Sequence, residues 1–102
     1  MSEWIQIART SEIPQGTIKM IEANRARIAL ANIDGTFYAI EDRCSHDDGP
    51  LGQGELDGKE VECPRHGARF DMTTGKPMNL PAVVPVKSFQ VKVDDNNILI
   101  EL

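Results

Sequence analysis

Cysteine and histidine are scarce in this chain of 102 residues, which has only two of each. It has no run of about twenty apolar residues, so no membrane-spanning helix is expected. The first ten residues lack a basic start followed by an apolar run, and no secretory signal is expected either. The net charge of −5 disfavours nucleic acid as a partner, because phosphate recognition needs a basic face. No glycine-rich phosphate loop is present, so a nucleotide or flavin site of that type is not indicated.

The scarce residues are gathered in two short segments. Cys44-Ser45-His46 holds one thiol and one imidazole, and Cys63-Pro64-Arg65-His66-Gly67 holds the others, after a spacer of sixteen residues. Two matched loops that together contain every cysteine and histidine predict one metal site. Two thiolates and two imidazoles suit either a tetrahedral zinc ion or a [2Fe–2S] cluster in which histidines replace two of the four cysteines. The predicted ligands are Cys44, His46, Cys63 and His66.

The order of the ligands favours the cluster. In a Rieske [2Fe–2S] centre one iron binds both cysteines and the other binds both histidines, so each loop must reach both irons. A C-x-H loop and a C-x-x-H loop each supply one ligand of each kind at short range. Zinc sites with two cysteines and two histidines usually group like with like along the chain, whereas here the two types alternate. Zinc stays open as the alternative metal.

Around these ligands the chain resembles the Rieske ferredoxins, small electron carriers that serve bacterial ring-hydroxylating oxygenases. The shared pattern is C-x-H, a spacer of about this length and then C-x-x-H-G. The likeness extends to Ile13-Pro14-Gln15-Gly16, Thr74-Gly75-Lys76-Pro77 and Leu80-Pro81-Ala82. The resemblance implies one [2Fe–2S] cluster, with the two cysteines on one iron and the two histidines on the other.

The expected function is electron transfer without catalysis. Every histidine and cysteine is used as a ligand, and a ligated imidazole is a poor general base, so no nucleophile–base pair remains. No cysteine is left for a disulfide, which makes a reducing cytoplasm the expected compartment. By resemblance, the chain takes one electron from a flavin-dependent reductase and passes it to a terminal oxygenase that hydroxylates aromatic rings. We expect a monomer that docks transiently with both partners near His46 and His66.

Two other functions remain open from the sequence. One is a small Rieske subunit held permanently in an enzyme such as a nitrite reductase, although members of that group often lack the full ligand set that this chain keeps. The other is a non-redox zinc-binding interaction module.

The hydrophobic pattern is that of β-strands. Alternating or apolar runs predict strands at 4–7, 26–33, 36–40, 89–93 and 98–102. Asp34-Gly35 is a two-residue turn typical of a hairpin between the second and third of these. Residues 17–27 are ambiguous, and we interpret them as strand and turn. Glycine and proline predict irregular chain over 49–58 and 75–85.

These strands predict a single all-β domain over residues 1–102. Residues of about 1–42 and 85–102 are expected to pair into one antiparallel base. The segment from about residue 43 to residue 84 is expected to form a smaller cluster-binding lobe inserted into this base. The resemblance implies this organisation too, as a Rieske-type fold. The cluster is expected at the exposed tip of the lobe, because electron tunnelling weakens steeply with distance.

Residues beside the ligands carry weaker predictions. Gly67 is interpreted as letting its backbone approach a sulfide and donate an N–H, as a turn glycine, or as both. Leu51, Leu80 and Pro81 are interpreted as an apolar cover over the cluster or as ordinary core residues. The charged neighbours are interpreted as solvated or as docking residues; they are Asp47, Asp48, Arg65 and Arg69.

The resemblance also implies a low reduction potential. High-potential Rieske proteins carry a loop disulfide, for which the matching positions here are Gly49 and Arg65. They also carry serine and tyrosine hydroxyls that donate to sulfur, where this chain has Ala68 and Phe70. We therefore expect a reduction potential at the low end of the Rieske range, about −150 mV.

Overall fold

The computed structural model of the protein describes residues 3–43, 50–64, 67–79 and 84–102, and the chain in these ranges is built of short strands without an α-helix. The strands are β1 (Trp4–Arg9), β2 (Ile18–Ala23), β3 (Ala26–Ile33), β4 (Thr36–Glu41), β5 (Glu55–Asp57), β6 (Glu60–Glu62), β7 (Arg69–Asp71), β8 (Ser88–Phe89), β9 (Val91–Asp94) and β10 (Asn97–Glu101). Two 3₁₀ helices accompany them, η1 (Thr10–Glu12) and η2 (Leu51–Gln53). The all-β prediction is confirmed. No helix in the described ranges is long and apolar enough to cross a membrane.

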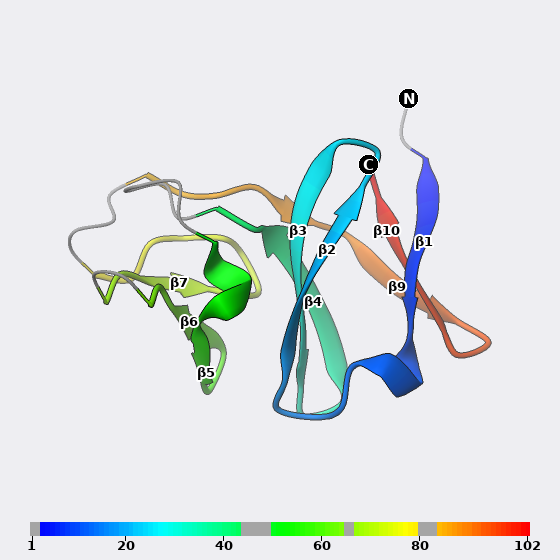
Figure 1. The fold of residues 1–102 in the computed structure, drawn as a ribbon, viewed down its shortest axis with the longest axis horizontal. Helices are drawn as coiled ribbons and strands as arrows, with labels where there is room; N and C mark the ends of the chain where they lie inside the picture. Colours follow the sequence, from blue (N-terminus) through cyan, green and yellow to red (C-terminus); the bar gives the residue numbers. More distant parts are fainter. Residues whose placement is uncertain (1–2, 44–49, 65–66, 80–83) are drawn as a thin grey trace.

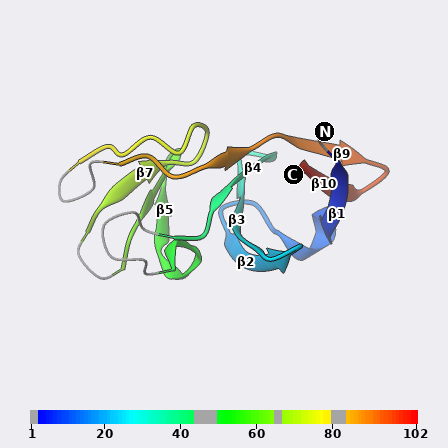
Figure 2. The ribbon, with the colours of Figure 1, turned by 90° about the horizontal axis from the view of Figure 1, so that it is seen from above.

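The strands form three antiparallel sheets, in the orders β1-β10-β9, β2-β3-β4-β8 and β5-β6-β7. Figures 1 and 2 show the first two sheets together on one side of the molecule, here called the base, and the third sheet with η2 on the other side, here called the lobe. Strands β1 and β10, from the two ends of the chain, pair in the base, so the lobe is inserted between β4 and β8. An antiparallel base with an inserted lobe was predicted; the division of the base into two sheets was not.

Strand β3 lies at the centre of the molecule and is buried on both faces. Ile28 and Leu30 belong to the apolar cluster that joins the two sheets of the base. Ala29 and Ala31 belong to a second cluster shared with the lobe, because successive side chains of a strand point to opposite faces. The lobe residues of this second cluster are Leu51, Val61, Cys63, Ala68, Phe70 and Met72. Burial on both faces explains why this part of the chain is almost continuously apolar.

Two-residue turns join neighbouring strands of the base. Asp34 and Gly35 (φ 54° and 87°) connect β3 to β4, which confirms the predicted hairpin. Asn24 and Arg25 (φ 47° and 68°) connect β2 to β3, so residues 17–27 are strand and turn as predicted. Positive φ at both residues gives the backbone twist that matches the twist of the paired strands.

The predicted strand over 89–93 is two strands in two different sheets. Strand β8 pairs with β4, placing Phe89 opposite Ala39, whereas β9 pairs with β10. Gln90 lies between them, and its carbonyl accepts a hydrogen bond from the Glu101 N–H at 3.0 Å. An alternating pattern identifies a strand but not the sheet that it joins, so this crossing between sheets was not predicted.

The lobe has more regular structure than the sequence indicated. Residues 49–58 were expected to be irregular, yet their described part contains η2 and β5, and β5 pairs with β6 through Leu56 and Val61. The prediction was wrong because a three-residue strand is too short to show a period. Gly58 (φ 61°) forms the turn between these strands and does not interrupt the sheet. The described part of 75–85 contributes only a single bridge, between Pro77 and Phe70.

Candidate metal centre

Of the four predicted ligands, only Cys63 lies in the described part of the chain. It directly follows β6, its side chain is 1% exposed, and its thiol is free. Within the described ranges, no three His, Cys, Asp or Glu side chains are grouped to hold a metal ion. The predicted site residues that lie outside these ranges are Cys44, His46, His66, Asp47, Asp48, Gly49, Arg65, Leu80 and Pro81.

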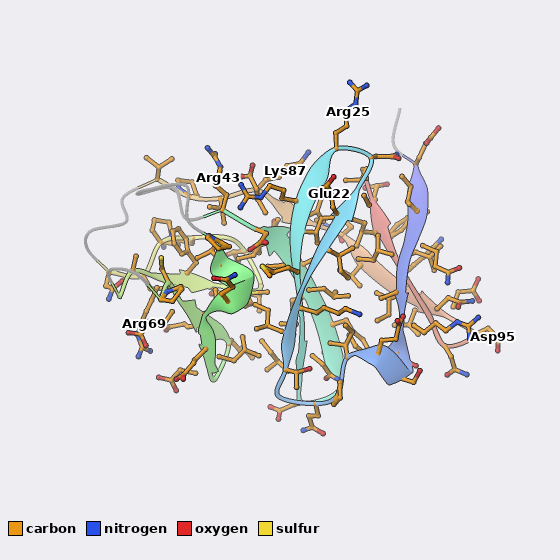
Figure 3. The ribbon with its side chains drawn as sticks, viewed as in Figure 1. Glu22, Arg25, Arg43, Arg69, Lys87 and Asp95 are labelled. Atoms are coloured by element: carbon orange, nitrogen blue, oxygen red, sulfur yellow. The ribbon has the colours of Figure 1, made fainter. Side chains whose placement is uncertain are left out.

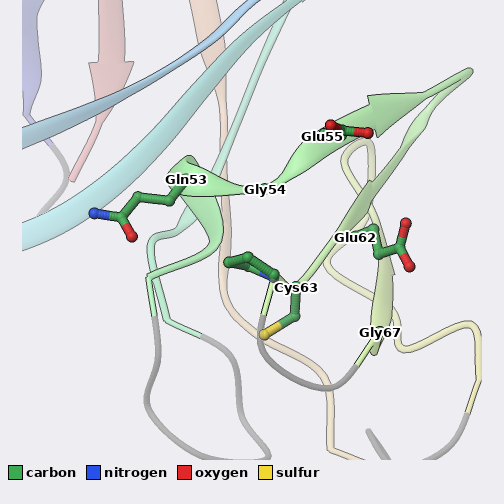
Figure 4. Close-up of a pocket in the computed structure, with 7 residues that line it drawn as sticks. Gln53, Gly54, Glu55, Glu62, Cys63 and Gly67 are labelled. Atoms are coloured by element: carbon green, nitrogen blue, oxygen red, sulfur yellow. The ribbon is translucent and has the colours of Figure 1, made fainter.

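Cys63 lines a hollow of about 340 Å³ in the lobe. Gln53 of η2, Gly54 and Glu55 of β5 line it together with residues 62–64 and Gly67 (Figure 4). The neighbours of Cys63 in the apolar core are buried, whereas the hollow itself is partly open. A thiol at such a boundary suits a metal ligand, since the thiolate is the form that binds metal and an open side leaves room for a cluster.

Backbone hydrogen bonds fix both ends of the second ligand loop. The Cys63 N–H donates to the Ala68 carbonyl at 2.6 Å, which continues the pairing of β6 with β7. The Gly67 N–H donates to the Cys63 carbonyl at 3.1 Å. Cys63 and Gly67 are therefore held together at the two ends of the segment that contains His66.

Gly67 is a turn glycine. Its φ of 73° lies in the left-handed region, and a Cβ added there would meet only the Glu62 Oε1, at an ordinary 3.5 Å. The backbone conformation, and not a shortage of space, explains the glycine. In the described chain its N–H donates to the Cys63 carbonyl, and donation to a sulfide stays a prediction.

The ends of the first ligand loop are joined by Asp42. This side chain is 4% exposed, and its Oδ1 accepts the Gly52 N–H at 2.7 Å. The Asp42 N–H donates to the Arg27 carbonyl of β3 at 2.8 Å, which anchors the same residue to the base. The segment between Asp42 and Gly52 contains Cys44 and His46. Sequence reasoning missed this role, because nothing in the sequence separates a buried aspartate from the exposed ones.

Asn79 ties a third segment to the second ligand loop. Its side-chain oxygen accepts the Arg69 N–H at 2.7 Å, and its amide nitrogen donates to the Gly67 carbonyl at 3.3 Å. The Met78 N–H donates to the Arg69 carbonyl at 2.8 Å, so the chain before residue 80 runs beside β7. Asn79 was also missed, because its two partners are remote in sequence.

Two predicted neighbours of the site have structural roles. Leu51 is an ordinary core residue, fully buried in the same group of apolar residues as Cys63. Arg69 pairs with Asp57 at 2.7 Å, and its hydrogen bond with this carboxylate raises the pKa of the guanidinium, so Arg69 stays charged. A docking role for Arg69 is not supported by these contacts.

Gly54 packs directly against the strand that leads to Cys63. A Cβ on Gly54 would overlap the Glu62 carbonyl oxygen, a backbone atom that cannot rotate away. We expect Gly54→Ala to lower the free energy of unfolding by about 3 kcal/mol, at the upper end of the usual cost of overpacking. Gly52→Ala is the comparison with a smaller expected loss, since its Cβ would overlap only the half-exposed Met20 side chain, which can turn outward, and would lie 3.3 Å from the Asp42 Oδ1. Urea denaturation measures both losses, and equal losses would contradict this interpretation.

The comparison with protein families decides the type of protein. The model of the Rieske [2Fe-2S] domain matches residues 3–90. The chain belongs to the Rieske [2Fe–2S] family. Its cofactor is accordingly one [2Fe–2S] cluster, which confirms the preference for a cluster over zinc.

The Rieske chain is similar over nearly its whole length to ferredoxins of dioxygenase systems. It is 33% identical over 99 residues to the ferredoxin component of the naphthalene 1,2-dioxygenase/salicylate 5-hydroxylase systems of a Ralstonia species, covering 97% of this chain and 95% of the relative. It is 42% identical over 95 residues to the 3-phenylpropionate/cinnamic acid dioxygenase ferredoxin subunit of Photorhabdus laumondii, covering 92% and 90%. Like these relatives, it is an electron carrier and not an enzyme by itself.

A solved complex shows the same fold beside an oxygenase. The Rieske chain is similar to the complex of reduced oxygenase and oxidised ferredoxin in carbazole 1,9a-dioxygenase, with a TM-score of 0.90 and 35% identity over 95% of this chain and 91% of that chain. The Rieske-type fold implied by the ligand motif is thus confirmed.

Proposed function

We propose that this Rieske chain is the ferredoxin of a multicomponent oxygenase. It takes one electron from a flavin-dependent reductase and delivers it to a terminal oxygenase that hydroxylates an aromatic ring. The likeness to dioxygenase ferredoxin components over almost the entire chain carries the proposal. The cytoplasm is the proposed compartment, because thiolate ligands are preserved under reducing conditions.

The proposed ligands are Cys44 and Cys63 on one iron and His46 and His66 on the other. The buried thiol of Cys63 at the edge of an open hollow supports this assignment. So do the hydrogen bonds that hold together the ends of both ligand loops. When bound, the cluster accepts one electron and gives it up again. In this proposal residues 1–102 form one Rieske domain, with a base of about 1–42 and 85–102 and a cluster-binding lobe of about 43–84.

The lobe's own side chains limit access of water to the proposed cluster. Val61, Phe70 and Met72 are fully or almost fully buried in the same group of apolar core residues as Cys63. An apolar surrounding of this kind controls solvent access and local dielectric, both of which affect a redox centre. Polar groups of the lobe are used instead to hold the ligand loops in place.

Charged residues on the described surface suit docking by electrostatic steering. Basic residues line a hollow of about 280 Å³; they are Arg25, Arg27, Arg43 and Lys87, with Glu41 among them. Figure 3 shows Arg43 and Lys87 beside the stretches that connect base and lobe, and Arg25 at the tip of the β2–β3 turn. Acidic residues outnumber the basic ones on the hairpin of β5 and β6 in the lobe, even though Arg69 pairs with three of them; the acidic residues are Glu55, Asp57, Glu60 and Glu62. Patches of opposite sign let one small protein attract partners of different charge in turn.

We expect docking to be weak, transient and sensitive to salt, with the contact near His46 and His66. A carrier must leave each partner, and redox encounters have small interfaces. Gel filtration of the native cell extract is the test, at ionic strengths of about 0.01 and 0.15 M, where the screening length falls from about 30 to about 8 Å. The Rieske chain is expected to elute as a monomer at the higher ionic strength. Stoichiometric elution with a large subunit at both would favour the permanent enzyme subunit.

A further inference from the structure

Arg69 is the centre of an ion-pair network on the lobe. Its guanidinium lies 2.7 Å from the Asp57 carboxylate and 3.6 Å from each of the Glu60 and Glu62 carboxylates. The network joins β5, β6 and β7, the three strands that precede and follow Cys63 and the second ligand loop (Figure 3). Its side chain is only 32% exposed, so this charge is partly shielded from solvent.

Two of these carboxylates differ mainly in their distance from the metal centre. Glu60 and Glu62 lie two residues apart on β6 and therefore on the same face of the strand. Each is 3.6 Å from Arg69, and their side chains are 33% and 42% exposed. Glu62 immediately precedes Cys63, whereas Glu60 lies about 7 Å further along the strand.

Glu62 is close to both ends of the second ligand loop. It precedes Cys63 in sequence, and its Oε1 would lie 3.5 Å from a Cβ on Gly67, the residue after His66. Its carboxylate and the Cys63 sulfur point to opposite sides of the strand (Figure 4), so Glu62 is a neighbour of the centre and not a ligand. Any effect on a cluster held by this loop is therefore a through-space effect of charge.

We propose that Glu62 and Arg69 form a charge pair that tunes the reduction potential of the cluster. Reduction adds one negative charge to the centre, so the Glu62 carboxylate opposes it and the Arg69 guanidinium favours it. Arg69 also offsets the other two carboxylates of the network, which keeps the acidic hairpin from lowering the potential further. This inference rests on the proposed ligand set, because it requires the cluster to be bound by the loop of Cys63 and His66.

The test is direct voltammetry of the purified, cluster-loaded protein at an ionic strength of about 0.01 M, where exposed charges are least screened. Glu62→Gln is expected to raise the midpoint potential, with the one-electron equilibrium constant changing roughly threefold. At 59 mV per tenfold change, this is a shift of about 28 mV. Glu60→Gln, the matched control, is expected to shift it less. Arg69→Gln is expected to lower it, and the double variant Glu62→Gln/Arg69→Gln to return it towards the wild-type value.

The outcomes separate this inference from the proposed function. An unchanged electron-spin resonance spectrum of each reduced variant shows that the cluster itself is intact. If Arg69→Gln does not fold, Arg69→Lys is the variant to measure, because it keeps the charge. Equal shifts for Glu60→Gln and Glu62→Gln, or a lower potential for Glu62→Gln, would overturn the charge pair while leaving the electron carrier in place. Failure of the wild-type chain to hold a cluster would overturn both.

Discussion

Replacing either predicted histidine ligand by alanine is expected to abolish the native cluster. In His46→Ala and His66→Ala the iron and acid-labile sulfide content should fall from about two of each per chain to near zero. The chain has no third histidine or cysteine that could take the vacant position. Chemical analysis of iron and sulfide, together with the visible absorption spectrum, measures the loss.

A neighbouring substitution provides the control for these variants. Asp48→Ala changes the same loop as His46 but removes a side chain that we interpret as solvated, so it is expected to retain iron and sulfide at the wild-type level. A histidine variant with the wild-type spectrum and iron content would refute the assignment of that residue as a ligand. It would also reopen the choice among the residues that hold the second iron.

The wild-type cluster is expected to have a reduction potential at the low end of the Rieske range, about −150 mV. The side chains of Ala68 and Phe70 are fully buried in the same group of apolar core residues as Cys63, and neither has a hydroxyl group. Hydrogen bonds to sulfur stabilise the added electron, so their absence lowers the potential. We expect Ala68→Ser and Phe70→Tyr each to raise it, provided that the new hydroxyl reaches sulfur.

Position within the core distinguishes this effect from a general effect of polarity. Ala31→Ser adds the same hydroxyl to a fully buried alanine of the same apolar cluster, but on β3 of the base. It is expected to leave the potential unchanged, whatever it does to stability. Voltammetry of the three single variants and the wild type gives the comparison. A wild-type midpoint above about +100 mV would show that these hydrogen bonds do not control the potential.

The sequence was most informative where a residue type or the spacing of apolar residues indicates a structural element by itself. Strands β3 and β4 and their Asp34-Gly35 hairpin were predicted because apolar runs and a turn dipeptide are local features. Strand β5 was not, because its pairing with β6 depends on a partner and not on its own three residues. The split of 89–93 into β8 and β9 was missed for a related reason, since the choice of sheet is made by distant strands.

The same distinction applies to the metal centre. The proposed ligand loops were predicted from the spacing of four rare residues, which needs no knowledge of the fold. The groups that hold the loops were not identified, because Asp42 and Asn79 act on partners ten or more residues away. Arg69 was interpreted as a solvated or docking residue, but the pairing of β5, β6 and β7 brings three carboxylates to it.

Electron-spin resonance of the purified protein after reduction, with metal and sulfide analysis of the same sample, tests directly whether this chain carries a Rieske cluster. We predict a coloured protein with about two irons and two acid-labile sulfides per chain. Reduction is predicted to give one unpaired electron per chain, with the signal of a [2Fe–2S] centre that has two histidine ligands. A colourless protein that holds stoichiometric zinc after expression with ample iron and sulfide, and gives no signal on reduction, would contradict the assignment.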